Sequence, residues 1–280
     1  MGQQKIVGEK NPQKTDFTNL KLGLKNICRN ILVLVLFLIF WQILSIVTGS
    51  IFRFVPKPLE VLNAIKYLIF QGDLEGYKLI SDHVYWSTLR ILTGFILASI
   101  TGIPLGFVTG LSPSFYRTFK VIIEPIRFIP PIAWIPLAIV LLLGFSRYTF
   151  LIWLGIFFPI WTNTMASIPT VNPIYINVAK VNGANRSKII RKVIWPSVLP
   201  GILTGMRIGL GVGWMAIVAA EMVGGEARGI GHLILKYAEL FKFAEVGAGM
   251  ITVGIVGYLM NEIILRIEKK IFKWRLEVSL

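Results

Sequence analysis

Four charged residues lie within or close to long apolar stretches of the sequence, where charge is rare: Glu124, Arg127, Arg207 and Glu262. Burying such groups in a membrane is expensive, so they are usually paired with one another or take part in function. Arg207 lies about ten residues into its apolar stretch, which at 1.5 Å per residue places it roughly 15 Å deep. We therefore expect Arg207 either to form a structural ion pair, with Glu124 as its partner, or to attract an anion.

The sequence lacks the patterns that mark common catalytic sites. It contains no Gly-x-x-x-x-Gly-Lys-Ser/Thr phosphate loop, so the chain is not expected to hydrolyse ATP itself. It contains no His-Glu-x-x-His motif, and neither His83 nor His232 has a cysteine or a second histidine beside it in the sequence. The single cysteine, Cys28, has no partner for an intrachain disulfide. We expect no catalytic residue, metal site or cofactor in this chain.

The composition indicates a polytopic, all-α membrane protein. The 280 residues are 55% hydrophobic and 15% charged, whereas a soluble domain carries about 25% charge. The apolar residues gather in blocks of about 20, the length that crosses a hydrocarbon core. These blocks predict a transmembrane domain over 31–267, between an N-terminal tail (1–30) and a C-terminal tail (268–280). The six predicted spans cover 27–47, 85–110, 119–143, 148–168, 197–220 and 246–267.

The net charge of +15 is distributed as the topology of a membrane protein requires. Of the 29 lysines and arginines, 18 lie in four predicted inner segments, which are 1–30, 111–120, 169–196 and 266–280. Basic residues at the ends of apolar blocks follow the positive-inside rule, and they do not form one patch for nucleic acid. We therefore expect a multi-pass protein of the plasma membrane, surrounded by lipid, with both termini in the cytoplasm.

Glycines spaced by four residues mark two of the predicted spans. Residues at this spacing share one helix face, and small ones let two helix backbones approach closely. The glycines predicted to pack in this way are Gly102, Gly106, Gly110, Gly201, Gly205, Gly209 and Gly213.

The predicted span 119–143 is unusual because it contains four prolines. Proline removes a backbone donor and disrupts a helix, and broken backbone at membrane depth is tolerated where it is buried in protein or lines a cavity. Two interpretations stay open, a kinked structural helix and a helix that lines a substrate path. Polarity, proline breaks and depth together select the candidate path residues, which are Pro130, Pro131, Trp134, Asn163, Thr204, Arg207 and Trp214.

The basic segment 172–196 predicts two short helices that project from the inner side. Asn172 followed by proline is typical of a helix start, and Gly183 suits a helix end with positive φ. Asn185 or Ser187 is expected to cap the second helix, which should end at Trp195-Pro196. A compact basic surface held between two spans favours docking of a partner over a loop that serves only topology. Its expected docking residues are Asn177, Ala179, Lys180, Gly183, Ala184, Arg186, Lys188 and Pro196.

This segment resembles the motif of binding-protein-dependent ABC importer permeases: Glu-Ala-Ala, three residues, Gly, nine residues, Ile-x-Leu-Pro. With Gly183 on the glycine of the motif, Ala179 and Pro196 match, while Asn177 replaces the acidic residue and Trp195 the leucine. We therefore expect docking to depend on the shape of the helices and on basic side chains rather than on a carboxylate. Further stretches are similar to the nitrate, sulfonate and taurine permeases: Ser87-Thr88-Leu89-Arg90, FIPPIAWIPLAI (128–139), FFPIWTNT (157–164), LTGMRIGLGVGW (203–214) and VAAEMVGG (218–225).

The resemblance implies a type I ABC importer permease fold with six transmembrane helices. It implies two permease copies, as a homodimer, two ATP-binding subunits that carry ATP and Mg²⁺, and an external solute-binding protein. The implied cargo is a small oxoanion or organosulfonate, such as nitrate, taurine or an alkanesulfonate, with bicarbonate, riboflavin or a thiamine precursor as alternatives. A stand-alone secondary transporter or channel, and a basic membrane adaptor for nucleic acid or anionic lipid, are the rival hypotheses.

Overall fold

The computed structural model describes residues 12–49 and 55–271, and the chain divides into two compact units, 1–61 and 62–280. The first unit contains helix α1 (Pro12–Gly49), whose stretch 28–47 has a mean hydropathy of 2.6. The indole Nε1 of Trp41 donates a hydrogen bond of 3.1 Å to the carbonyl of Pro56, which fixes the chain after the helix. Part of the expected N-terminal tail is helical from Pro12 onwards, and residues 1–11 lie outside the described residues.

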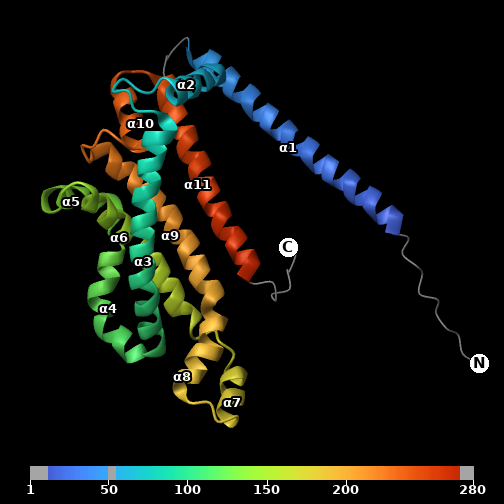
Figure 1. Cartoon of the computed structure of the whole chain (residues 1–280), viewed down its shortest axis with the longest axis vertical. Helices are drawn as coiled ribbons and strands as arrows, with labels where there is room; N and C mark the ends of the chain where they lie inside the picture. Colours follow the sequence, from blue (N-terminus) through green and yellow to red (C-terminus); the bar gives the residue numbers. More distant parts are fainter. Residues whose placement is uncertain (1–11, 50–54, 272–280) are drawn as a thin grey trace, which may run out of the picture. The chain divides into compact units, whose positions relative to one another are not determined.

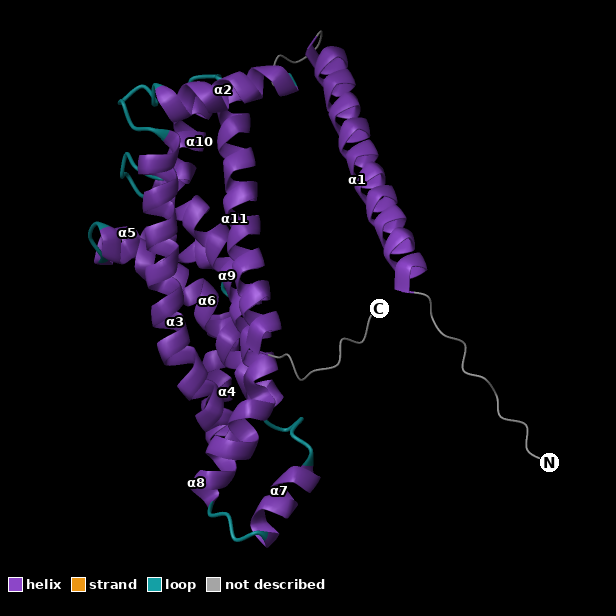
Figure 2. Ribbon diagram, turned by 45° about the vertical axis from the view of Figure 1, so that its right-hand side comes forward, coloured by secondary structure: helices purple, strands orange, loops and turns teal. Residues whose placement is uncertain are grey.

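Helix α2 (Pro58–Phe70) follows, and the second unit then consists of helices and short turns. Figure 2 shows no strand in the described part of the chain. The long helices are α3 (Tyr85–Leu111), α4 (Pro113–Arg127), α6 (Phe145–Ser167), α9 (Trp195–Val223) and α11 (Phe243–Ile271). The shorter ones are α5 (Ile135–Leu141), α7 (Pro173–Val181), α8 (Arg186–Ile189) and α10 (Ile230–Glu239), with a 3₁₀ turn at Pro131–Trp134 and π-helical turns at Leu79–Val84 and Ile190–Ile194.

Five helices of the described chain are long and apolar enough to cross a membrane, and there are six if the two parts of a broken pair count as one span. The broken pair joins 120–127 to 131–141 with a bend of 96°. The break lies within the predicted span 119–143. Proline explains the break, because Pro130 and Pro131 offer no backbone N–H to continue the ladder and disfavour helical backbone before them.

Helices α3, α6 and α9 form the centre of the second unit (Figure 1), and their facing sides are buried. Ile152, Ile156 and Ile160 of α6 have no exposed surface, and Ile217 of α9 is equally buried. Figure 1 also shows that α7 and α8 lie at one end of this unit and α10 at the other. We refer to these as the α7–α8 end and the α10 end.

Glycines of α3 let it lie parallel to α6 at close range. A Cβ on Gly102 would stand 3.1 Å from Cγ2 of Ile160, and one on Gly106 would stand 2.5 Å from Cβ of Thr164, tighter than side chains accept. Every contacting pair has the same separation along the sequence, so the two helices keep one register over their whole length. The four pairs are Gly94 with Ile152, Gly102 with Ile160, Gly106 with Thr164, and Gly110 with Ile168.

Two hydrogen bonds cross the same helix pair, each between residues 52 positions apart. The indole Nε1 of Trp153 donates to Oγ1 of Thr101, and that of Trp161 donates to Oγ1 of Thr109, both over 3.0 Å. On a neighbouring face of α6, the glycines of α9 run antiparallel to it. The contacting pairs there are Gly201 with Ser167, Gly205 with Asn163, Gly209 with Ile156, and Gly213 with Ile156.

The sequence predicted that the second short helix of the basic segment ends at Trp195-Pro196. In the structure this helix continues beyond that point. Residues 186–223 form one continuous helical rod in which α8, a π-helical turn and α9 follow without a gap. The ring of Pro196 would collide with the carbonyl four residues earlier in a regular α-helix. The π-helical turn at Ile190–Ile194 widens the rod directly before this proline, and the helix can therefore pass through it.

Candidate functional site

The α7–α8 end is a helical hairpin whose caps hold its shape. The side-chain oxygen of Asn172 accepts from the backbone N–H of Ile174 over 2.9 Å, and that of Asn185 accepts from Lys188 over 2.9 Å. Asn185, rather than Ser187, therefore caps the second helix. Between the two helices Gly183 has φ +73°, a conformation that other residues adopt only with strain.

The structure gathers several of the expected docking residues around one hollow of this hairpin. Lys180, Ala184 and Arg186 line a cavity of about 440 Å³ together with apolar residues of the rod that follows. Asn177 and Lys188 are exposed nearby, Ala179 is half-buried, and Pro196 lies half-buried in the first turn of α9. The α7–α8 end thus presents a preformed surface with basic side chains on it.

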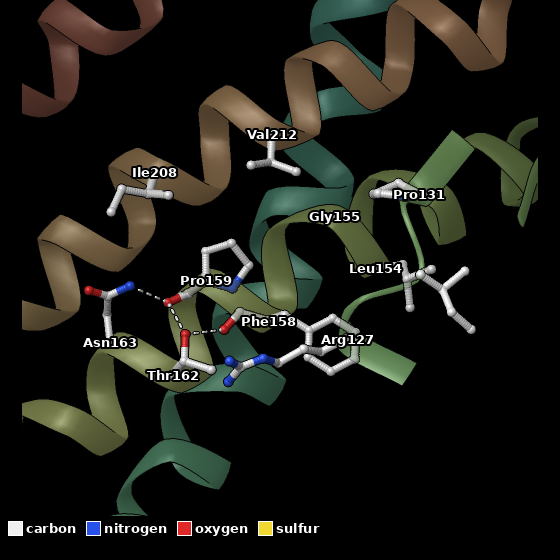
Figure 3. Close-up of a pocket in the computed structure, with 11 residues that line it drawn as sticks. Arg127, Pro131, Leu154, Gly155, Phe158, Pro159, Thr162, Asn163, Ile208 and Val212 are labelled. Carbon is white, nitrogen blue, oxygen red and sulfur yellow. Dashed lines mark hydrogen bonds between the residues drawn. The ribbon is translucent and has the colours of Figure 1, made fainter. Parts of the chain in front are cut away.

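A second cavity lies where the broken span meets α6 and α9. It has a volume of about 440 Å³, and Figure 3 shows its residues converging from three parts of the chain. The residues that line it are Arg127, Ile129, Pro131, Leu154, Gly155, Phe158, Pro159, Thr162, Asn163, Ile208 and Val212. We call this space the central cavity.

Arg127 is the charged side chain that lines the central cavity. It stands at the last position of α4, directly before the break, and 32% of its side chain is exposed. Its NH1 lies 3.5 Å from Oε1 of Glu124, one turn earlier, and its guanidinium lies 5.0 Å from the ring centre of Phe128. A cation in this position can attract an anion that enters between α6 and α9.

The predicted path residues divide into two groups. Pro131 and Asn163 line the central cavity, whereas Pro130, Trp134 and Thr204 are not among its lining residues. Arg207 and Trp214 also lie outside the cavity, because both are bound to α11. The indole Nε1 of Trp214 donates to the carbonyl of Val253 over 3.0 Å, and NH1 of Arg207 lies 3.6 Å from Oε2 of Glu268.

The expected ion pair between Glu124 and Arg207 does not form. Glu124 is bound within its own helix, by Arg127 and by the hydroxyl of Tyr116. Arg207 pairs instead with Glu268, which was assigned by sequence to the C-terminal tail. Helix α11 continues into this predicted tail as far as Ile271, and residues 272–280 lie outside the described part.

The structure also contains a network of charged residues at the α10 end, none of which was predicted from the sequence as a site residue. Arg90 is fully buried, and its guanidinium donates to Glu221 over 2.8 Å, to Glu226, and to the carbonyl of Arg228 over 2.7 Å. The hydroxyl of Ser87 also donates to the carboxylate of Glu221, over 2.8 and 2.9 Å. We call Ser87, Arg90, Glu221 and Glu226 the buried network.

Backbone groups complete this network. The N–H of Gly231 donates to Glu221 over 3.0 Å, and the N–H of Ile230 donates to Oγ of Ser87 over 3.0 Å. Gly229 has φ +145°, and a Cβ there would stand 2.5 Å from the carboxylate carbon of Glu221. The segment between α9 and α10 is therefore tied to α3 at several points. The central pair of the network, Arg90 and Glu221, lies in two stretches that resemble the permeases, Ser87-Thr88-Leu89-Arg90 and VAAEMVGG. Hydrophobic periodicity did not indicate that these two stretches are in contact.

A smaller polar cluster surrounds Asp73 at the same end. Nε2 of His83 lies 3.6 Å from Oδ2 of Asp73, and Nζ of Lys236 lies 3.4 Å from the same oxygen. Burial raises the pKa of nearby Tyr237 to about 12, and the negative charge of Asp73 adds to this. The Tyr237 hydroxyl consequently stays protonated at physiological pH. No group of three metal-binding side chains occurs in the described part of the chain.

The central cavity between the spans and the basic hairpin at one end together define a class of protein, a helical membrane protein of the transporter kind. The comparisons agree. Residues 102–273 match the family described as the binding-protein-dependent transport system inner membrane component. The chain belongs to this family. It is an ABC importer permease, a multi-pass protein of the inner membrane and a transport component rather than an enzyme.

Individual relatives span nearly the whole chain. An ABC transporter permease protein of Methanocaldococcus jannaschii is 36% identical over 92% of this chain and 96% of its own length. The taurine transport system permease protein TauC of Escherichia coli is 33% identical over 81% of this chain and 82% of its own. Other relatives at 31–32% identity are named as permeases for aliphatic sulfonates, nitrate and bicarbonate.

The fold has a counterpart among solved structures. A chain of the MetNI methionine ABC transporter, in an inward-facing conformation, superposes with a TM-score of 0.59 at 20% identity. The match covers 69% of this chain and 95% of that one. The second unit therefore has the type I importer permease fold that the sequence resemblance implied.

Proposed function

We propose that this chain is the membrane-spanning subunit of an ATP-driven importer that takes up a small oxoanion or organosulfonate. The observation that carries this proposal is Arg127 in the central cavity, where a broken span, α6 and α9 meet. The relatives named for taurine, sulfonates, nitrate and bicarbonate support an anion as the cargo, because each of these molecules carries an anionic group. Nitrate, taurine, an alkanesulfonate and bicarbonate are all within this proposal.

The energy for import comes from a separate chain. The sequence has no phosphate loop, so we assign ATP and Mg²⁺ to two ATP-binding subunits that dock on the α7–α8 end. Besides its basic residues, this end exposes apolar side chains on α7, of which Val178 and Val181 are 55% and 89% exposed. Docking therefore combines the shape of the hairpin, apolar contact and the positive charge of Lys180, Arg186 and Lys188.

The complete importer contains two copies of this permease, with the α7–α8 end in the cytoplasm and the α10 end facing an external solute-binding protein. The distribution of basic residues supports this orientation, because the segment 169–196 has five basic residues and no acidic one. A cavity reached alternately from the two sides of the membrane is how such transporters move a solute.

The decisive experiment is reconstitution. The permease, co-purified with its ATP-binding subunit, is placed in proteoliposomes with the binding protein and radiolabelled taurine, nitrate or ethanesulfonate. Uptake should require ATP and stop when ATP is replaced by a non-hydrolysable analogue. Uptake by the permease alone, without ATP and without a partner, would instead identify a stand-alone secondary transporter or channel.

A further inference from the structure

The walls of the central cavity are apolar on most sides. Leu154 and Phe158 of α6 line it beside Arg127, whereas Ile208 and Val212 of α9 line it on another side, and Pro131 adds the broken span to its wall (Figure 3). Apolar walls bind a ligand by removing hydrocarbon from water and offer no hydrogen bond to an anion in exchange for its hydration. The shape of the cavity alone therefore favours a ligand that has hydrocarbon of its own.

The polar side chains of the cavity are largely occupied by their own helix. The hydroxyl hydrogen of Thr162 is donated to the carbonyl of Phe158 over 2.8 Å, and the amide of Asn163 donates to the carbonyl of Pro159 over 2.8 Å. Among the described residues that line the cavity, the second amide hydrogen of Asn163 is the neutral side-chain donor that remains. Pro159 itself offers no N–H, so the carbonyl four residues earlier, at Gly155, loses its regular helical donor.

The cavity therefore holds one cationic donor group, at one edge. The guanidinium of Arg127 is partly exposed, and its ion pair with Glu124, at 3.5 Å, is formed through NH1, so NH2 and Nε can donate to a ligand. A planar guanidinium binds a carboxylate or a sulfonate through two parallel hydrogen bonds. It cannot by itself replace the water around a small inorganic oxoanion, whose charge is exposed on every side.

We infer that the central cavity binds an organic anion with its charged head on Arg127 and a short apolar body against Leu154, Ile208 and Val212. The inference rests on the proposed function and narrows its cargo. It separates an aliphatic sulfonate or carboxylate, which satisfies both the cation and the apolar walls, from nitrate or bicarbonate, which satisfies only the cation.

A single reporter cysteine tests this directly. The chain has one natural cysteine, Cys28, so Cys28→Ser removes the background thiol. Ile208→Cys then places a thiol in the cavity wall, where the natural side chain is 48% exposed. The purified importer complex is labelled with N-ethylmaleimide, an uncharged reagent, in sodium 1-butanesulfonate or in sodium nitrate at equal ionic strength. Thr162→Cys serves as a second reporter if the first variant does not fold.

The butanesulfonate should slow labelling at a concentration at which nitrate does not. Because each buried methylene adds apolar contact, the concentration for half-protection should fall by up to about fourfold per carbon from methanesulfonate to butanesulfonate. Butanoate distinguishes a carboxylate head from a sulfonate head. Adding Arg127→Gln should abolish the protection, and a thiol at Val121, which is 80% exposed outside the cavity, should label at the same rate in every salt.

Three results would overturn the inference: protection by nitrate at the same or lower concentration, protection independent of chain length, or no protection by any of these anions. Labelling needs neither ATP nor the binding protein. If the reconstituted importer shows ATP-dependent uptake but none of the anions slows labelling, this inference is wrong and the proposed function still stands.

Discussion

Arg90 and Arg127 are both arginines of membrane helices, but their surroundings are opposite. Arg90 is fully buried, holds two carboxylates and a carbonyl, and lies over the ring of Tyr148 at 4.2 Å. Arg127 is 32% exposed, has one carboxylate at 3.5 Å and opens into a cavity. The terminal nitrogens of Arg90 are engaged by two carboxylates and a carbonyl of its own chain, while the guanidinium of Arg127 keeps donors for a group that the chain does not supply.

This difference separates positions that hold the fold from positions that act on a solute. In the low dielectric of the interior a buried charge is stable only when its partners are complete. The buried network at the α10 end meets that condition for charge, since two carboxylates face Arg90, and it joins α3, α9 and the segment before α10. The central cavity does not meet it, and for this reason it is the better candidate for binding.

Removing the charge of Arg90 should have the largest effect. The substitution Arg90→Leu leaves Glu221 buried without its cation and should destabilise the protein by about 3–5 kcal/mol, comparable to the whole stability of many domains. Thermal unfolding in detergent and the yield of monodisperse protein measure this. The control is Arg228→Leu, an exposed arginine of the same segment whose guanidinium lies over the rings of Tyr77 and Trp86, and it should lose far less stability than Arg90→Leu. Equal melting temperatures for Arg90→Leu and the control would show that the network is not structural.

The glycine contact between α3 and α6 should come next. Gly106→Val introduces a side chain where a Cβ would already stand 2.5 Å from Cβ of Thr164, and overpacking of this kind costs about 1–3 kcal/mol. Gly211→Val is the matched control, because nothing lies within 4 Å of that position. Thermal unfolding should separate the two variants by several degrees. If both variants unfold at one temperature, α3 and α6 do not need their close approach.

Arg127→Gln tests the other side of the comparison. Uptake by the reconstituted importer should fall about tenfold, which corresponds to the loss of one contact of about 1.4 kcal/mol, while the melting temperature stays unchanged. Arg207→Gln is the control, because Arg207 already pairs with Glu268 outside the cavity. Its uptake should fall less than that of Arg127→Gln. The reverse order would place the anion on α9 near Arg207, as the sequence first suggested.

The smallest effects are expected at the α7–α8 end, where side chains are exposed. Gly183→Val forces a β-branched residue into φ +73° and should lower the solute moved per ATP hydrolysed by about threefold through local strain. Asn177→Ala changes an exposed position and should leave that ratio almost unchanged. Parallel measurement of ATP hydrolysis and uptake gives the ratio. A larger loss for Asn177→Ala would mean that docking depends on the motif's first position after all.

The helical elements of the fold could be predicted from the sequence because apolar blocks, glycine spacing and helix caps are local signals. The hairpin, for example, is indicated by two helix caps and a glycine that lie close together in the sequence, Asn172, Asn185 and Gly183. The bend of the broken span was only half visible, since prolines indicate a break but not its angle.

The partners of the charged residues were not visible in the same way. Arg90 and Glu221 are separated by 131 positions, and Arg207 meets Glu268 across two helices, so no local spacing connects them. Arg127 was noted as an intramembrane charge, but only the folded chain shows that it lines a cavity whereas Arg207 does not. Pairing between distant helices depends on how they pack, which periodicity alone does not determine.

The shared register of α3 and α6 restricts how this chain can change in length. Each residue advances an α-helix by about 100°, so one inserted residue between Gly94 and Gly102 would turn every later glycine away from α6. The indole bonds of Trp153 and Trp161 would be lost together with them. We therefore expect an insertion or deletion within either helix to disrupt this contact, and one in a segment outside it, such as 142–144, to leave the contact in place.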